Sequence, residues 1–305
     1  MVTALPLLSC NSNREGSVTL VYPNKVNYES FLIAGHLGYF QEGGYNIRTR
    51  FVNSGIFAAE ALSLGDANVA AMGDGPTVIL LAQGREVSII SRYAKGERMH
   101  RLISDTLIKE PGDLAGKRLG VQAGSSTHAA LLGWLESSGL SDNVTIVPMD
   151  PQNMPEAVLT RQLDAIAGSE PWALNTEKLC GDRVYELVNL YSVKNHYPHL
   201  LIATNRTLQN NENALKSIIR ALDKANHLIH AYPDSAAAIA ARYIGLSTED
   251  EKVVMSRIRW EQGWEEADSA SIEETARFFY QSGRISQKPE LNRYFNILSA
   301  GPAAE

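Results

Sequence analysis

The sequence predicts an α/β protein of two lobes, each a mostly parallel sheet flanked by helices. Short β-rich runs alternate with helical patterns from residue 18 onward, as expected for parallel sheets covered by helices. The same plan starts again after residue 113. The chain has 305 residues, a length at which chains usually divide into two domains.

The first half contains the turn residues that separate its predicted elements. Gly65 ends one helix, and Pro76 suits the first turn of the next. Apolar runs and alternation predict strands at 18–22, 45–52, 68–72, 87–93 and 100–106, and helices at 28–40, 57–64 and 77–83.

The second half repeats this alternation. Ser125 or Ser126 caps a predicted helix that runs to Gly139, with an apolar stripe that includes Leu131 and Trp134. We expect strands at 117–121, 144–149, 164–168, 184–190 and 199–203, further helices at 155–162 and 171–179, and mostly helix after residue 205.

The two halves also resemble each other in detail. Glu60 and Glu156 each open a short helical run that leads into a strand, and an acidic residue, Asp74 or Glu170, follows each strand. Both pairs are 96 residues apart (156 − 60 and 170 − 74), which indicates a duplicated lobe.

Open parallel sheets bind ligands at the carboxyl ends of their strands, so two facing lobes are expected to share one cleft. Residues 100–106 and 199–203 are predicted to cross between the lobes. We therefore assign residues 17–104 and 205–305 to the first lobe, residues 105–204 to the second, and residues 1–16 to a tether.

Composition excludes several classes of function. The net charge is −6 with no basic block, which argues against a nucleic-acid partner. No apolar run is long enough to span a membrane. Two cysteines, Cys10 and Cys180, exclude a disulfide framework or a cysteine-rich metal site, and we expect neither a metal nor a cofactor.

Cys10 follows a short apolar stretch, residues 2–8, and a polar segment follows it. This arrangement resembles the end of a bacterial lipoprotein signal, in which the cysteine is lipidated and tethers the chain outside the cytoplasm. The alternative is a free cysteine in a frayed terminus, because the stretch is short and lacks basic residues at its start.

Several motifs, in their order and spacing from residue 18 to residue 295, resemble the type II periplasmic binding proteins that serve sulfonate, taurine, nitrate and thiamine-pyrimidine importers. The motifs are Gly38-Tyr39-Phe40, Gly65-Asp66, Leu114-Ala115-Gly116-Lys117, Ser126-Thr127-His128, Glu170-Pro171 and Tyr232-Pro233. The resemblance implies an extracytoplasmic, monomeric substrate-binding component that closes on a small ligand and delivers it to an ABC membrane permease.

The most informative candidate ligand site is the loop Ser125, Ser126, Thr127 and His128 at a predicted helix N-terminus. Free backbone N–H groups and hydroxyls there suit a sulfonate, carboxylate or phosphate. The alternative is plain helix capping. No Gly-Lys-Ser/Thr follows, so a nucleotide loop is excluded.

The equivalent loop of the first lobe is Gly73 to Thr77, and it lacks the third glycine of a dinucleotide motif. Gly75 would let the backbone approach a ligand, and Thr77 is a further candidate contact. Asp74 and Glu170, if both point into the cleft, would bind an ammonium and favour a zwitterion such as an aminoalkyl sulfonate. Alternatively, Asp74 caps a helix and Glu170 accepts backbone N–H groups.

Aromatic and amide side chains near strand ends give a second ligand hypothesis. They are Tyr22, Asn24, Asn27, Tyr28 and Trp172. The pair Pro23-Asn24 followed by Asn27-Tyr28 is similar to the first loop of pyrimidine-precursor binders, where aromatic rings stack on a flat ligand. The alternative is that such tyrosines lie at the edge of the core.

Enzymes on this fold need features that the sequence does not show. The pyrimidine synthases that it resembles carry a cysteine cluster, which is absent, and the sulfinate desulfinases use a cysteine in the cleft, whereas Cys180 falls at a helix end. We therefore expect a non-enzymatic binding protein for a small organic anion, with a nitrogen heterocycle binder, an enzyme or a sensory receptor as alternatives.

Overall fold

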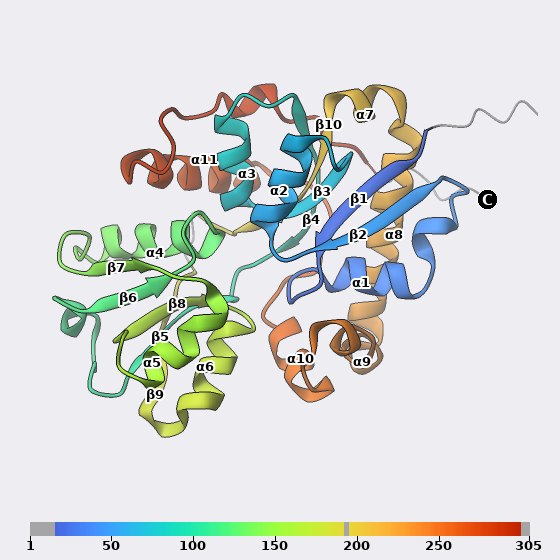
Figure 1. Ribbon diagram of the computed structural model, residues 1–305. Helices are drawn as coiled ribbons and strands as arrows, with labels where there is room; N and C mark the ends of the chain where they lie inside the picture. Colours follow the sequence, from blue (N-terminus) through green and yellow to red (C-terminus); the bar gives the residue numbers. More distant parts are fainter. Residues whose placement is uncertain (1–15, 192–194, 300–305) are drawn as a thin grey trace, which may run out of the picture.

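The computed structural model describes residues 16–191 and 195–299, and it has two lobes that lie side by side (Figure 1). Each lobe is built on one sheet of five strands. The sheet of the first lobe has the order β2-β1-β3-β10-β4, and its strands are β1 (Val18–Pro23), β2 (Ile47–Val52), β3 (Val69–Gly73), β4 (Val87–Lys95) and β10 (Pro198–Thr204). The sheet of the second lobe has the order β7-β6-β8-β5-β9, and its strands are β5 (His100–Asp105), β6 (Arg118–Val121), β7 (Thr145–Pro148), β8 (Ala165–Ser169) and β9 (Val184–Asn189).

Helices cover both faces of each sheet. Alternate residues of β1 contribute to two separate apolar clusters, which shows that this strand is buried on both faces. The helices of the first lobe are α1 (Glu29–His36), α2 (Gly55–Leu64), α3 (Asp74–Ala82), α7 (Asn205–Asn210), α8 (Glu212–Ala231), α9 (Pro233–Ile244), α10 (Thr248–Met255) and α11 (Glu266–Gln281). Those of the second lobe are α4 (Ser126–Ser137), α5 (Met154–Leu159) and α6 (Trp172–Cys180).

The predicted duplication is confirmed. β3 and β8 each lie third in their sheet and pair in parallel with the strand that precedes them in the order, β1 or β6. Their bounds, Val69–Gly73 and Ala165–Ser169, differ by the same 96 residues that separate Asp74 from Glu170. The third strand is thus equivalent in the two halves, and an acidic residue follows it in each.

The predicted lobe boundaries are wrong by one strand at each crossing. β5 pairs antiparallel with β8 and β9, so residues 100–104 belong to the second lobe. β10 pairs antiparallel with β3 and β4, so residues 198–204 belong to the first lobe. Each half donates one antiparallel strand to the other sheet, and the chain passes from one lobe to the other between β4 and β5, the first crossing, and between β9 and β10, the second crossing. An apolar strand pattern does not reveal which sheet the strand joins.

The C-terminal helices belong to the first lobe but reach the second. α11 packs on α3 and also on α4, and α10 lies close to α6 (Figure 1). Ion pairs join the lobes on both sides, since Arg277 of α11 meets Glu136 of α4 at 2.8 Å and Lys178 of α6 meets Asp250 of α10 at 2.5 Å. Within the described part of the chain, no helix has the length and apolar character that a membrane crossing requires.

Candidate functional site

A cavity of about 40 Å³ lies between the lobes, where the parallel strands of both sheets end. We call it the interlobe cavity. Its lining residues are Lys25, Asn27, Tyr28, Ser54, Gly55, Ile56, Gly73, Pro76 and His199 from the first lobe, and Met99, His100, Gln122, Ser125, Ser126, Thr127 and Ser169 from the second lobe and the first crossing. The two lobes are in direct contact beside this small cavity, so we expect them to separate to admit an organic ligand.

The lobes touch directly beside the interlobe cavity. The backbone N–H of Gly75 donates a hydrogen bond to Oγ of Ser126 across the cleft at 3.2 Å. A Cβ atom on Gly75 would lie 2.6 Å from the backbone nitrogen of Ser126, closer than real Cβ atoms approach. The close backbone approach predicted at Gly75 therefore exists, but it is made to the other lobe.

Four polar atoms at the interlobe cavity have no hydrogen-bond partner among the described residues. They are Oδ1 of Asn27, Oγ of Ser54, Nε2 of His100 and Nδ1 of His199. Their residues are at most 7% exposed, and each unsatisfied buried group costs about 1–3 kcal/mol. Unsatisfied polar groups that lower the stability of the protein and lie together at one cavity indicate a ligand-binding site.

His100 and His199 occupy equivalent positions in the two lobes. His199 is paired with Gly73 at the end of β3, and His100 with Ser169 at the end of β8. Burial, with a contribution from the charge of Lys25, lowers the pKa of both histidines to about 3. Both imidazoles are therefore neutral near pH 7, and each offers a ring nitrogen to the cavity.

Lys25 supplies the positive charge of the interlobe cavity. It follows β1 and makes no ion pair with an acidic side chain of the described chain. Burial lowers the pKa of Lys25 to about 8, so the ammonium group remains largely protonated at pH 7. An ammonium without a counter-charge beside neutral hydrogen-bonding groups is suited to an anion.

Five of the residues predicted as ligand contacts line the interlobe cavity: Asn27, and the hydroxyl-bearing Tyr28, Ser125, Ser126 and Thr127. Their hydroxyls, however, already have protein partners. Oγ of Ser125 donates to the carbonyl of Gln122 and accepts the N–H of His128 as the cap of α4. Oγ1 of Thr127 lies 2.8 Å from Nδ1 of His100. What α4 offers a ligand is thus the backbone N–H groups of Ser126 and Thr127, which have no acceptor among the described residues.

The structure does not bring Asp74 and Glu170 to the interlobe cavity, as the ammonium hypothesis requires. Neither Asp74 nor Glu170 lines the interlobe cavity, although both are fully buried. Asp74 starts α3, three residues before the expected helix start, and its carboxylate accepts a hydrogen bond from Thr275 of α11. Burial raises the pKa of Asp74 despite that bond.

Glu170 instead joins elements of both lobes. Its carboxylate lies 3.1 Å from Nη1 of Arg101 and 3.1 Å from Nε of Arg257, which belongs to the first lobe. It also accepts the backbone N–H of Leu174 in α6. The alternative of a carboxylate that accepts a backbone N–H group therefore describes Glu170 correctly, and the two arginines were not anticipated.

Replacing Glu170 with glutamine is expected to lower the free energy of unfolding by about 1–3 kcal/mol, because a buried charge-assisted network is weakened. Anion affinity should change less than threefold, since the side chain does not line the interlobe cavity. Thermal denaturation and calorimetric titration measure the two effects. If the anion affinity fell while the stability did not change, Glu170 would instead be a ligand contact.

The remaining predicted residues also lie outside the lining of the interlobe cavity. Asn24 is exposed and donates to the carbonyl of Tyr243, and Thr77 donates to the carbonyl of Gly73. His128 accepts the N–H of Gly124, and burial lowers its pKa to about 4. Trp172 begins α6. Cys10 lies outside the described residues.

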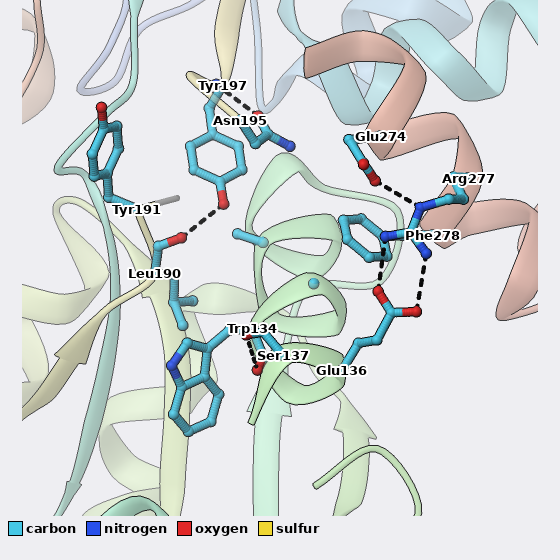
Figure 2. A pocket seen from close by; sticks show the side chains of 12 residues that line it. Trp134, Glu136, Ser137, Leu190, Tyr191, Asn195, Tyr197, Glu274, Arg277 and Phe278 are labelled. Atoms are coloured by element: carbon cyan, nitrogen blue, oxygen red, sulfur yellow. Dashed lines mark hydrogen bonds and ion pairs between the residues drawn. The ribbon is translucent and has the colours of Figure 1, made fainter. Parts of the chain in front are cut away.

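A second and larger cavity, of about 330 Å³, lies on another face of the cleft (Figure 2). It is lined by α4, the second crossing and α11, with Trp134 and Phe278 among its aromatic walls. Its cation, Arg277, is already paired with Glu136 and Glu274 (Figure 2). Its lining cation is thus already paired with two carboxylates and is not free for an anion, so the smaller interlobe cavity is the better candidate site.

Sequence reasoning missed Lys25, Ser54, His100 and His199. A signal existed for the first two, because both follow strands whose carboxyl ends face the cleft. His100 and His199 lie at the beginning of β5 and β10, and each of these strands joins the sheet of the other half of the chain. Only this exchange places both histidines at the edge of the sheets that faces the cleft.

Comparison with solved structures identifies the class of fold as the two-lobed periplasmic-binding-protein architecture. The alkanesulfonate-binding protein SsuA from Xanthomonas axonopodis pv. citri, bound to MOPS, superimposes with a TM-score of 0.82 at 20% identity, over 92% of this chain and 98% of that one. SsuA from Escherichia coli gives 0.82 at 18% identity, over 91% and 96%. The desulfurization enzyme DSZB shares the fold with a TM-score of 0.66 at 15% identity, over 92% and 96%.

A profile of the family described as NMT1/THI5 like matches residues 25–236. The chain belongs to this family. A candidate binding protein of Brucella abortus (strain 2308) is 27% identical over 218 residues, which are 70% of this chain and 66% of that protein, just under two thirds. The taurine-binding periplasmic protein of Escherichia coli (strain K12) is 29% identical over 134 residues, 44% of this chain and 41% of that protein.

Proposed function

We propose that this protein is the extracytoplasmic substrate-binding component of an ABC importer and that it captures a small organic anion by lobe closure. The observation that carries the proposal is Lys25, a cation without an acidic partner in the described chain, beside four unsatisfied buried polar atoms in a cavity between two lobes. Relatives named for alkanesulfonate and taurine binding support an aliphatic sulfonate as the ligand.

Binding would proceed by the chemistry of this cavity. Lys25 attracts the anionic group, and the first-turn N–H groups of α4 and the hydroxyl of Ser54 provide donors around it. Closure brings Gly75 against Ser126 and removes the ligand from water, which strengthens every electrostatic contact. Only the closed form makes all of these contacts, so the ligand stabilises closure.

The partners and location follow from the same proposal. The ligand-loaded form would dock on a membrane permease, and the chain would act outside the cytoplasm, tethered through Cys10 if that residue is lipidated. An enzyme on this fold is a weaker candidate, because burial raises the pKa of the Cys180 thiol, and Cys180 is buried among apolar residues of the second lobe away from the interlobe cavity.

A thermal-shift screen tests the proposal. Alkanesulfonates, nitrate and bicarbonate are compared with pyrimidines at equal concentrations. A sulfonate at a hundred times its dissociation constant should stabilise the protein by about 2.7 kcal/mol, which is a shift of several degrees in melting temperature. A shift with pyrimidines alone would support the heterocycle alternative instead, and no shift with any anion would end the proposal.

A further inference from the structure

Asn27 lines the interlobe cavity, and its backbone and side chain are held in place. Its backbone has a φ of 76°, a region that asparagine tolerates better than most residues, and its carbonyl accepts a hydrogen bond from Tyr93 at 3.2 Å. Its Nδ2 lies 3.5 Å from Nε2 of His199, while Oδ1 is buried without a partner in the described chain. The cavity thus contains a fixed and unused acceptor.

The tautomer of His199 follows from this contact. An amide N–H can only donate, so Nε2 of His199 accepts and the proton of the neutral ring lies on Nδ1. Nδ1 has no partner among the described residues, so it offers a donor. Lys25 and Ser54 also offer donors. Against these donors, Oδ1 of Asn27 is an obligate acceptor.

A ligand ammonium is a poor match for this acceptor. No aspartate or glutamate lines the interlobe cavity in the part of the chain that the structure describes. Asp74 and Glu170 are occupied by Thr275 and by two arginines. An ammonium would therefore lie near Lys25 without a counter-charge, and like charges a few ångströms apart in a cleft repel strongly. A hydroxyl or neutral N–H satisfies Asn27 without that repulsion.

We infer that the ligand is an oxyanion with an uncharged hydrogen-bond donor on its short chain, and that Oδ1 of Asn27 accepts from this donor and selects it over an ammonium. This inference rests on the proposed function and deepens it. Among two-carbon sulfonates it distinguishes the hydroxyl compound, isethionate, from ethanesulfonate and from taurine.

Calorimetric titration with these three sulfonates tests the inference. The native protein should bind isethionate about tenfold more tightly than ethanesulfonate, because the latter leaves a buried acceptor unpaired. Taurine should bind more weakly than either. Equal binding of isethionate and ethanesulfonate, or tightest binding of taurine, would overturn the assignment of Asn27 while leaving anion capture intact. Failure of all three to bind would count against the proposed function itself.

A pair of matched variants sharpens the test. Asn27→Asp keeps the shape and the φ preference but supplies the missing carboxylate, so the ratio of taurine affinity to isethionate affinity should rise at least tenfold. Asn24→Asp adds the same charge in the same loop at an exposed side chain outside the cavity lining, and should leave the ratio unchanged. An unchanged ratio in Asn27→Asp would contradict the inference, and if that variant does not fold, the native ligand series still decides it.

Discussion

Replacing Lys25 with methionine is expected to weaken anion binding about a hundredfold or more and to raise the melting temperature of the ligand-free protein. Removing one member of a desolvated charge pair costs about 2–5 kcal/mol of binding free energy. Before the ligand binds, however, Lys25 is a partly desolvated cation without an acidic partner in the described chain. Methionine keeps the length of the side chain without the charge, so stability should rise by about 1–3 kcal/mol.

Opposite changes in affinity and stability separate a ligand-binding role from a structural one. Lys216 provides the control, because it lies on α8 in an ion pair with Glu212 at the surface. Lys216→Met should change neither quantity by more than about 0.5 kcal/mol. If Lys25→Met bound a sulfonate with unaltered affinity, Lys25 would not be a ligand contact, and the proposed function would lose its main support.

The pH dependence of binding gives an independent readout of Lys25. Its pKa in the folded protein is about 8, below the ordinary value of 10.5. Anion affinity should therefore fall as the pH rises through 8, by up to tenfold per unit, as the ammonium loses its proton. In the ligand-free protein the sign is reversed. Between pH 8 and 10.5 the unfolded chain holds the extra proton, so stability relative to Lys25→Met should increase with pH.

The sequence predicted the plan of the fold because that plan is a local, repeated pattern. The alternation of elements and the 96-residue offset reappear as β3 and β8, each third in its sheet. The same offset identified Asp74 and Glu170 as equivalent positions, but the sequence could not predict what their carboxylates contact. A position just past a strand fixes the edge of the sheet, but it does not fix where the side chain points.

Partners distant in the sequence decided the roles of those two carboxylates. One carboxylate oxygen of Asp74 accepts from Thr275, 201 residues later, and Glu170 pairs with Arg101 and Arg257. The loop from Ser125 to His128 shows the same limit, since capping of α4 and the bond to His100 use the hydroxyls that were predicted to face a ligand. Lys25 was overlooked because a lysine in a loop is usually solvated, and the sequence does not show that this loop lines a cavity between the lobes.

Replacing Gly75 with alanine is the second change from which we expect a large effect. The new Cβ would meet the backbone of Ser125 and Ser126 at 2.6 Å, and backbone atoms at the start of α4 cannot rotate away as a side chain can. The closed form would be destabilised and the apparent dissociation constant would rise in proportion to its lost population, about tenfold to a hundredfold. Small-angle X-ray scattering should show no compaction when a sulfonate is added.

The stability of the ligand-free Gly75→Ala protein should not fall, because alanine favours the helical backbone of α3 by about 0.5–1 kcal/mol over glycine. The matched control is Gly112→Ala, whose Cβ would have its nearest neighbour at 3.9 Å, far from the cleft contact. If Gly75→Ala became fully compact on adding the sulfonate and bound it with native affinity, the lobes of the ligand-bound protein would not come as close as the contact between Gly75 and Ser126. Closure on the ligand would then be limited by the ligand itself and not by the contact of Gly75 with Ser126.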